Sequence, residues 1–322
     1  MKTKITLAAL LLVGITTVNA QKKYDIKTAK TYAEISAKTD GKWQGRKYIG
    51  GTTFKNVDRL KLAPEHTDHS FDIRYEGPGW ESNRIGYRLY LDWRNAIDIF
   101  GKKTPEMILP RVGQDNFDSY HEMSDWGADI LKAGKAIGIG SIDRYLNNEK
   151  LHFREVDSTI ATVANKTTES VVKVQYYGWK TASDKIDFTS ELTIKPDELY
   201  TQHKIQASKE IKGICTGIAK QKNTEFLKKD SKNKKWAYIA TYGVQSLVPD
   251  KLGMAIFYEV NTIENIADTD LDYLLVFKPT TKATSFYLLG AWEQEQNGIK
   301  SKEEFVKYLD AQLEILNKKG KM

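Results

Sequence analysis

Side chains capable of acid–base chemistry are concentrated between Asp118 and Lys132, where the sequence reads DSYHEMSDWGADILK. Tyr120, His121 and Glu122 are consecutive, and Trp126 follows shortly after. Histidine titrates near neutral pH and is the most frequent general base, and a tyrosine hydroxyl can donate a proton. Tryptophan offers a flat surface on which a sugar ring can stack. The segment therefore indicates proton transfer at a sugar, and the alternative is a loop histidine that makes only structural hydrogen bonds.

A second polar and aromatic passage runs from Tyr75 to Lys103 (YEGPGWESNRIGYRLYLDWRNAIDIFGKK). Alternation along a strand places Tyr87 on one face and Arg88 on the other. An arginine beside aromatic rings suits the carboxylate of an acidic sugar, because the guanidinium binds a carboxylate through two hydrogen bonds. The alternative is a sheet face with cross-strand charge pairs. The candidate substrate-contacting residues in this passage are Trp80, Glu81, Arg84, Tyr87 and Arg88.

Other candidates are more scattered. His203 alternates within a predicted strand, and Trp292 and Glu293 stand where another predicted strand ends, so all three could line a sugar cleft. His66 and His69 have a spacing compatible with a metal, but no third ligand can be assigned, so a surface loop is the preferred interpretation and no metal is expected. The sequence has no G-x-S-x-G motif and no phosphate-binding glycine loop, and we expect no cofactor.

These residues must be positioned mainly by strands. Period-two alternation with many Val, Ile, Tyr and Trp residues recurs along the chain. The segments are 71–77, 85–93, 170–179, 186–194, 200–207, 254–260, 273–278 and 285–292. Ser301 with Glu304 forms a capping-box pattern before an amphipathic helix that should extend to Leu316. The pattern predicts an all-β protein, a large antiparallel β-sandwich with a C-terminal helix.

Residues 101–135 lack the alternation and are predicted to form a long loop with helical turns, one of them over 124–134. Long connections without regular structure in compact domains are usually functional, and polar loops on rigid sheets are frequent locations of sites. The cluster around His121 would then be displayed by a loop above the sandwich.

The N-terminal residues predict export. Lys2 and Lys4 precede a short apolar run, and small residues before Gln21 suit signal peptidase, so residues 1–20 are read as a signal peptide and 21–322 as a single β-sandwich domain. No cysteine near this cleavage site could carry a lipid anchor, so we expect a periplasmic or secreted protein without a membrane anchor.

Composition limits the partners. The net charge of +7 falls to +5 when the two leader lysines are removed, which suits an anionic oligosaccharide. The basic run from Phe226 to Trp236 lacks interleaved aromatic residues and is interpreted as a solvated hairpin loop, so nucleic acid is not expected. Cys215 is the single cysteine and should be buried in a core strand. The chain is expected to be a monomer or a homodimer.

The two polar passages, extended by GKAIGIGSI and joined by TGIAK and FYLLGAWEQE, resemble one family over roughly residues 49–309. It comprises secreted bacterial proteins, designated a domain of unknown function, from polysaccharide-utilisation loci, and it includes an ulvan oligosaccharide dehydratase. The resemblance implies a carbohydrate-active hydro-lyase, and by analogy a galactose-mutarotase-like super-sandwich.

The resulting expectation is a dehydratase that removes the C5 proton of a non-reducing terminal uronic acid and expels the 4-hydroxyl, giving a 4,5-unsaturated uronate. His121 would be the base, Tyr120 or Tyr87 the acid, and Arg84 or Arg88 would bind the carboxylate, with Trp80 and Trp126 stacking on the sugar. A polysaccharide lyase, a non-catalytic periplasmic carbohydrate-binding protein, and an epimerase using His203 with Glu293 are the alternatives.

Overall fold

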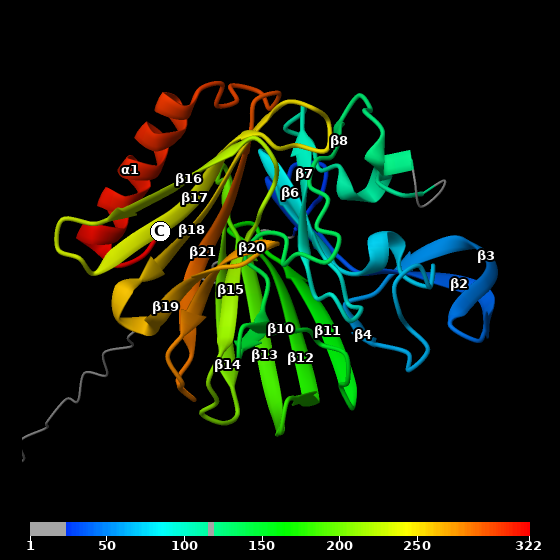
Figure 1. Ribbon diagram of the computed structural model, residues 1–322. Coiled ribbons are helices and arrows are strands. Elements are labelled where there is room, and N and C mark those ends of the chain that lie inside the picture. The colour runs from blue at the N-terminus through cyan, green and yellow to red at the C-terminus, as the bar shows by residue number, and fades with distance from the viewer. Residues whose placement is uncertain (1–23, 115–118) are drawn as a thin grey trace, which may run out of the picture.

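A computed structural model describes residues 24–114 and 119–322, and antiparallel strands dominate it (Figure 1). The predicted signal peptide and Asp118 lie outside these residues. Among the described residues, no helix is long and apolar enough to cross a membrane.

A nine-stranded antiparallel sheet forms the body of the molecule. Its strands, in spatial order, are β16 (Thr224–Asp230), β17 (Trp236–Val244), β18 (Lys251–Glu259), β21 (Thr284–Trp292), β14 (Tyr200–Ala207), β13 (Asp184–Ile194), β12 (Ser170–Thr181), β11 (Ser158–Asn165) and β4 (Arg59–Lys61). The long alternating segments of the sequence supply its central strands, because half of their side chains can enter the core while the others face outward.

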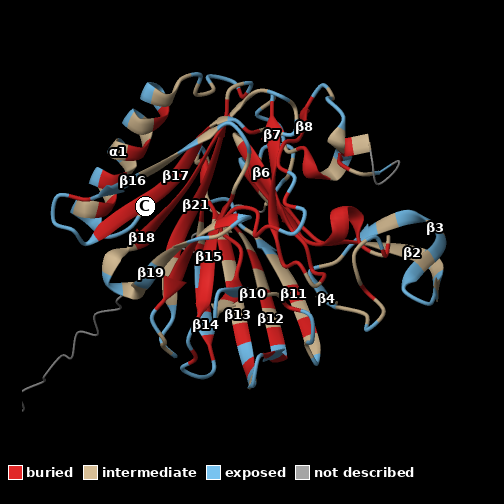
Figure 2. Ribbon diagram, viewed as in Figure 1, coloured by how far each residue is buried: buried red, intermediate tan, exposed pale blue. Residues whose placement is uncertain are grey.

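Three smaller sheets complete the fold (Figure 1). The first, called the site sheet below, has the order β1 (Thr31–Glu34), β5 (Gly79–Ser82), β6 (Ile85–Leu89), β7 (Ile97–Lys102), β8 (Gly127–Asp129). The second has the order β10 (Glu149–Leu151), β9 (Asp143–Leu146), β15 (Ile214–Ala219), β20 (Asp272–Phe277), β19 (Ile263–Asp268). The third is the hairpin of β2 (Ser36–Gln44) and β3 (Lys47–Asn56), which projects from the body and is far less buried than the sheets (Figure 2).

The site sheet packs against the large sheet through β21. Gly290 allows this close approach, since a Cβ atom there would lie 2.9 Å from the side chains of both Ile85 and Ile99. Leu288, on the same face of β21, contacts Gly140, which precedes β9. The apolar residues of the site sheet, of β15 and β20 and of the large sheet form one continuous core. The predicted antiparallel sandwich is therefore confirmed.

The C-terminal helix α1 (Lys302–Lys319) is also confirmed. The Ser301 hydroxyl accepts a hydrogen bond from the backbone N–H of Glu304, and the Glu304 carboxylate accepts one from the backbone N–H of Lys300. Phe305, Leu309, Leu313 and Leu316 are buried on one face. The helix packs on β17 and β18, where Phe305 stacks on Tyr242.

Two local predictions are wrong. Residues 71–77 contain the 3₁₀ turn η1 (Arg74–Glu76) instead of a strand, because Tyr75 and Glu76 have φ angles of 43° and 67°, which no strand accommodates. Residues 124–134 contain strand β8 instead of a helical turn, and β8 pairs with β7 at the edge of the site sheet. The remaining short elements are the 3₁₀ turns η2 (Leu109–Arg111), η3 (Ser119–His121) and η4 (Val260–Thr262).

Two further predictions are confirmed. Residues 226–236 belong to the β16–β17 hairpin, whose turn is largely exposed. Cys215 is a buried free cysteine in β15.

Candidate functional site

The outer face of the site sheet carries a buried polar group centred on Arg88. Register pairs Arg88 of β6 with Asp98 of β7, and it pairs Phe100 of β7 with Asp129 of β8. Side chains of one strand alternate between faces, so the polar residues lie opposite the core-facing Tyr87. We call Arg88, Tyr90, Asp98, Tyr120 and Asp129 the Arg88 cluster.

Both terminal nitrogens of the Arg88 guanidinium form hydrogen bonds within this cluster. Its Nη2 atom donates to Asp129 Oδ2 at 2.7 Å, to Asp98 Oδ2 at 3.0 Å and to the Tyr90 hydroxyl at 2.6 Å. Its Nη1 atom donates to the Tyr120 hydroxyl at 2.8 Å. The Tyr90 hydroxyl in turn donates to Asp98 at 2.5 Å. Two carboxyl groups thus share one buried cation.

His121 joins the Arg88 cluster to solvent. Turn η3 places its Nε2 atom 3.5 Å from Asp129 Oδ2, and about a third of the side chain, 30%, is exposed while Asp129 is fully buried. The backbone N–H of Leu131 donates to the other oxygen of Asp129 and holds that carboxyl group in place. A histidine oriented by a buried carboxyl and open to solvent has the geometry of a general base.

Burial controls the protonation of these carboxyl groups. It raises the pKa of Asp129 to about 8, although the Arg88 guanidinium acts in the opposite direction. It also raises the pKa of Asp98 above its ordinary value, again against Arg88. A charged group in an apolar environment loses its hydration, which is the physical cause. The net charge of the cluster therefore changes with pH in the neutral range.

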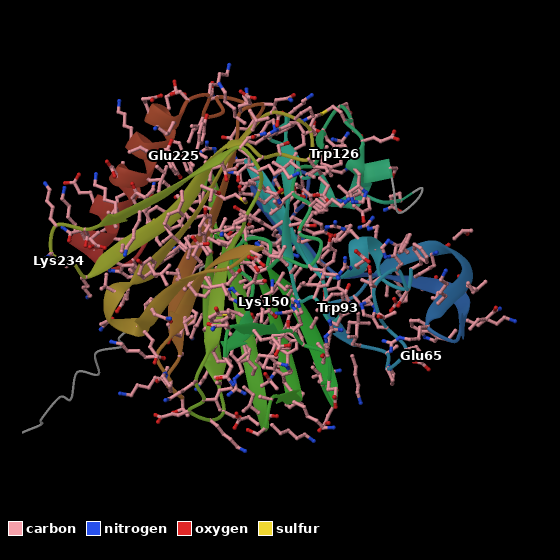
Figure 3. The ribbon with its side chains drawn as sticks, viewed as in Figure 1. Glu65, Trp93, Trp126, Lys150, Glu225 and Lys234 are labelled. Carbon is pink, nitrogen blue, oxygen red and sulfur yellow. The ribbon has the colours of Figure 1, made fainter. Side chains whose placement is uncertain are left out.

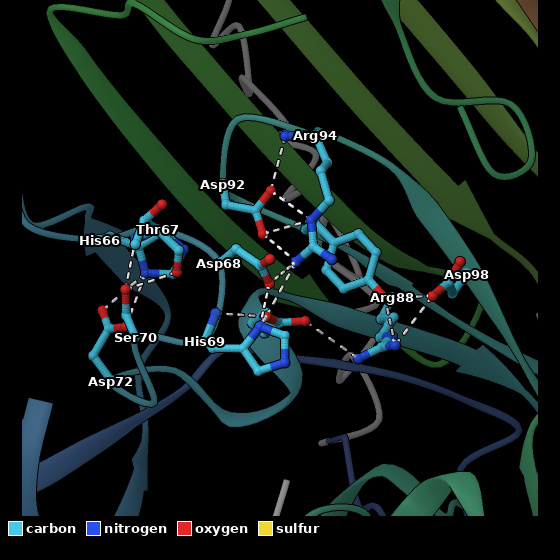
Figure 4. A network of polar contacts seen from close by, with 12 residues as sticks. His66, Thr67, Asp68, His69, Ser70, Asp72, Arg88, Asp92, Arg94 and Asp98 are labelled. Carbon is cyan, nitrogen blue, oxygen red and sulfur yellow. Dashed lines mark hydrogen bonds and ion pairs between the residues drawn. The ribbon is translucent and has the colours of Figure 1, made fainter. Parts of the chain in front are cut away.

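A second ionic network lies beside the first (Figure 4). His69 Nδ1 lies 2.5 Å from Asp68 Oδ1, and the backbone N–H of His69 donates to the carboxylate of Glu76. Arg94 forms ion pairs with Asp68 at 2.8 Å and with Glu76 at 3.1 Å. Arg94 also forms an ion pair with Asp92, its neighbour two residues earlier. This arrangement provides a second histidine–carboxylate pair.

Both networks line one cavity of about 450 Å³, called the His121 cavity below. Its lining residues are His69, Glu76, Arg88, Tyr90, Arg94, Asp98, His121, Leu131, Lys132, Gly134 and Leu247. The volume is that of a typical small-molecule site. Lys132 is exposed and, within residues 24–114 and 119–322, makes no ion pair, in contrast to Arg88 and Arg94.

Asp68, His69 and Glu76 could also hold a metal ion, since their ligand atoms lie within 4.8 Å of one another. Arg94 is already ion-paired with both carboxylates. A metal would have to displace this guanidinium, so the set fits a charge network better than a metal centre.

The structure brings some of the predicted site residues together. His121 and Arg88 line the same cavity, and Tyr120 joins them through its hydroxyl, which accepts from Arg88. The Tyr120 side chain is otherwise buried against Phe100. Trp126 belongs to the same apolar group and packs edge-to-face on Phe100.

The other predicted site residues of the Tyr75–Lys103 passage do not converge on the cavity. Tyr87 faces the core, where its hydroxyl donates to Leu199 O and accepts from the Gly290 N–H. Trp80 stacks on Tyr87, and its indole N–H donates to Thr201. These residues lie on the packed face of the site sheet, which excludes substrate.

Glu81 and Arg84, the two other charged candidates of this passage, each form an ion pair within the protein. Glu81 is buried in an ion pair with Lys102 at 2.6 Å and accepts two backbone N–H groups. Arg84 forms an ion pair with Glu295. Each charge therefore has a partner within the protein, and neither residue lines the His121 cavity.

The distant candidates are structural as well. The ring of His203 is buried between the Ser190 hydroxyl and Gly140 O. The indole N–H of Trp292 donates to Asp250, and Glu293 accepts from the backbone N–H of Lys251. His203 and Glu293 have separate partners and do not form the acid–base pair of the epimerase alternative.

Sequence reasoning missed five residues of the site: His69, Tyr90, Arg94, Asp129 and Lys132. Tyr90 shares the face of Arg88 by alternation, and Asp129 and Lys132 belong to the polar segment that contains His121. The sequence marked His69 only as a possible metal ligand beside His66, because the turn at η1 and a φ angle of 58° at His69 itself bring it to the cavity.

Comparison with solved structures finds weak global similarity to several proteins. One, provisionally described as a kojibiose phosphorylase from the human microbiome, has 12% identity and a TM-score of 0.39, with 73% of this chain and 32% of that chain covered. This chain thus spans about a third of that protein's length.

Two others are a protein provisionally described as an aldose 1-epimerase from Klebsiella pneumoniae subsp. pneumoniae MGH 78578 and the 4-alpha-glucanotransferase of Thermococcus litoralis. The first has 9% identity and a TM-score of 0.34, covering 76% of this chain and 84% of that one. The second has 12% identity and a TM-score of 0.33, covering 70% of this chain and 40% of that one.

Comparison with curated proteins gives no significant match. Comparison with protein families gives one that spans almost the whole sequence, from residue 9 to residue 322. The chain belongs to the family described as a domain of unknown function, DUF4861.

Proposed function

We propose that the His121 cavity binds the non-reducing terminal uronic acid of an oligosaccharide and eliminates water from it, giving a 4,5-unsaturated uronate. The observation that carries this proposal is the pairing of His121 with the buried Asp129 at a cavity that is also lined by His69, which contacts Asp68, and by Lys132, which makes no ion pair with the residues that the structure describes. Elimination needs a base, an acid and a cation, and one cavity supplies all three.

Proton abstraction is assigned to His121. The C5–H bond breaks, the proton moves to the imidazole, and the electron pair delocalises into the adjacent carboxylate as an enediolate. Asp129 orients the ring and stabilises the imidazolium that forms, at a contact of 3.5 Å between Nε2 and Oδ2. Asp129 gives this stabilisation in its ionised form, and the ionised fraction grows as pH rises through its raised pKa of about 8.

Carboxylate binding is assigned to Lys132. An enediolate carries more negative charge than the carboxylate from which it forms, so a cation beside it lowers the barrier. Arg88 and Arg94 are already neutralised by Asp98, Asp129, Glu76, Asp92 and Asp68. The exposed ammonium of Lys132 is therefore the better partner for an anionic substrate.

Departure of the 4-hydroxyl is assigned to His69. The C4–O bond breaks as the 4,5 double bond forms, and a proton from the imidazolium converts the leaving group into water. Asp68, 2.5 Å from Nδ1, orients this ring. Two histidines with separate carboxylate partners thus divide the roles of base and acid.

The decisive experiment incubates the purified protein with uronate-terminated ulvan oligosaccharides and follows mass and ultraviolet absorbance. The expected product is lighter than the substrate by one water, keeps its chain length and absorbs as an unsaturated uronate. Cleavage into shorter chains would assign the same chemistry to a lyase, and binding without conversion would assign the protein to the carbohydrate-binding class. Either result would overturn the dehydratase.

A further inference from the structure

A second, larger cavity lies next to the His121 cavity and has no role in the chemistry above. It measures about 610 Å³ and is called the Trp93 groove below. Its walls come from residues 91–93, which follow β6, from β4 and β11, and from the segments that carry His66 and Arg154. Figure 3 shows Trp93 between the strands of the large sheet and the segment that carries Glu65.

The two cavities share a wall. Asp92 lines the Trp93 groove and Arg94 lines the His121 cavity, and the two side chains form an ion pair. His66 likewise faces the groove, whereas His69, three residues later, faces the His121 cavity. The segments 66–69 and 91–94 therefore contribute residues to both cavities. Adjacent cavities of this kind suit consecutive rings of one oligosaccharide.

The groove has an excess of uncompensated positive charge. Arg46, Lys61 and Arg154 line it, and none of them makes an ion pair within the part of the chain that the structure describes. Its two carboxylates are already neutralised, Asp92 by Arg94 and Asp157 by Lys185. Unpaired cations around a concave surface attract an anionic ligand and hold it.

The groove also offers a surface for a sugar ring. Trp93 is half-buried, and the guanidinium of Arg154 lies 4.4 Å from the centre of its ring. The indole and the guanidinium together form a flat aromatic and cationic wall. Ser158 lines the same groove.

We propose that the Trp93 groove is a binding subsite for a second, acidic sugar ring of the oligosaccharide whose terminal uronate occupies the His121 cavity. Trp93 stacks on the ring, and Arg154, Arg46 and Lys61 bind its anionic group. The inference rests on the proposed function only for the identity of the ligand as an acidic oligosaccharide. It makes the protein selective for chains of at least two acidic residues.

The test measures binding by calorimetry in the His121→Ala background, so that no substrate is converted. The probes are an ulvan tetrasaccharide with a terminal uronate and the neutral cellotetraose. Trp93→Ala and Arg154→Ala are each expected to raise the Kd of the acidic tetrasaccharide about tenfold, which corresponds to roughly 1.4 kcal/mol. Arg154 is exposed, so its variant tests the groove even if Trp93→Ala fails to fold.

Matched controls replace similar side chains elsewhere. Trp43→Ala removes a half-buried tryptophan from the β2–β3 hairpin, and Lys228→Ala removes an exposed cation from β16. Both are expected to bind the acidic tetrasaccharide as the His121→Ala parent does. The subsite is overturned if Trp93→Ala and Arg154→Ala also bind it within about twofold of that parent, or if cellotetraose binds as tightly as the acidic chain.

The outcome is separable from the proposed reaction. If wild-type protein forms no unsaturated product but the two groove variants lose affinity, the subsite in the Trp93 groove is supported and the dehydratase reaction is refuted. If the unsaturated product forms and the groove variants retain full affinity, the dehydratase reaction is supported and the subsite in the Trp93 groove is refuted.

Discussion

The Nε2 atom of His121 lies 3.5 Å from Oδ2 of Asp129, so a partly exposed imidazole contacts a carboxyl group that is completely buried. The same oxygen accepts a hydrogen bond from Arg88. A chain of contacts thus runs from the cavity into the site sheet. It defines which substitutions should affect chemistry and which should affect folding.

His121→Ala is expected to lower turnover about 10²–10⁴-fold, the usual contribution of a general base. Its free energy of unfolding should change by under about 0.5 kcal/mol, because the side chain is partly exposed and belongs to a loop turn. Steady-state kinetics on uronate-terminated oligosaccharides and a thermal melt check both. Glu122→Ala, an exposed neighbour in the same loop, is the control. Turnover of His121→Ala within about twofold of wild type would remove His121 from the mechanism.

Lys132→Ala is expected to lower kcat/KM about tenfold or more, because the developing enediolate loses the cation that stabilises it. Lys135→Ala is the matched control, since Lys135 is exposed nearby but does not line the cavity. The loss should be larger at low than at high ionic strength, since salt screens an exposed charge. Equal kinetics for the two variants would contradict the assignment of Lys132.

Arg88→Met is expected to lower the free energy of unfolding by about 3–5 kcal/mol, because Asp98 and Asp129 would remain buried without their shared cation. Arg88→Lys should also weaken activity and stability, since an ammonium cannot reproduce the guanidinium fork. Denaturant unfolding measures the loss. Arg111→Met provides a comparison, as Arg111 is 43% exposed with exposed partners. An Arg88→Met protein as stable as wild type would show that the cluster contributes nothing to folding.

His203 should make the protein less stable in mild acid. Burial lowers the pKa of His203 to about 4, although its hydrogen bond to Gly140 acts in the opposite direction. As pH falls from about 6.5 to about 4, the unfolded chain binds a proton that the folded protein does not, so this residue's contribution falls by up to about 1.4 kcal/mol per pH unit. Unfolding curves at several pH values should show a weaker dependence for His203→Gln. If the stability of His203→Gln depended on pH as strongly as that of the wild type, His203 would not be the cause of the acid destabilisation.

Export is a separate proposal, since residues 1–20 lie outside the described part of the chain. We expect N-terminal sequencing of protein from the native host to begin at Gln21, in a periplasmic or secreted fraction. Protein that retains Met1–Ala20 would contradict the predicted signal peptide.

Much of the fold was readable in the sequence, because strand and helix patterns are local. Alternation identified the central strands of the large sheet, and Ser301 with Glu304 marked the start of the C-terminal helix. The failures were at 71–77 and 124–134, where an unusual backbone conformation and an edge strand pairing decided the structure. Neither the backbone conformation at 71–77 nor the strand pairing at 124–134 leaves a signal in the hydrophobic periodicity of the sequence.

The sequence alone determined that His121 stands in a polar loop and that Arg88 and Tyr90 share a strand face. Only the tertiary structure decided their partners, because Asp129 and Asp98 reach Arg88 through the register of β6, β7 and β8. It also assigned Tyr87 and Trp80 to the core and brought His69 to the cavity through a turn that no pattern marks. Residue types are local properties of a chain, whereas proximity between distant residues depends on how the sheets pair and pack.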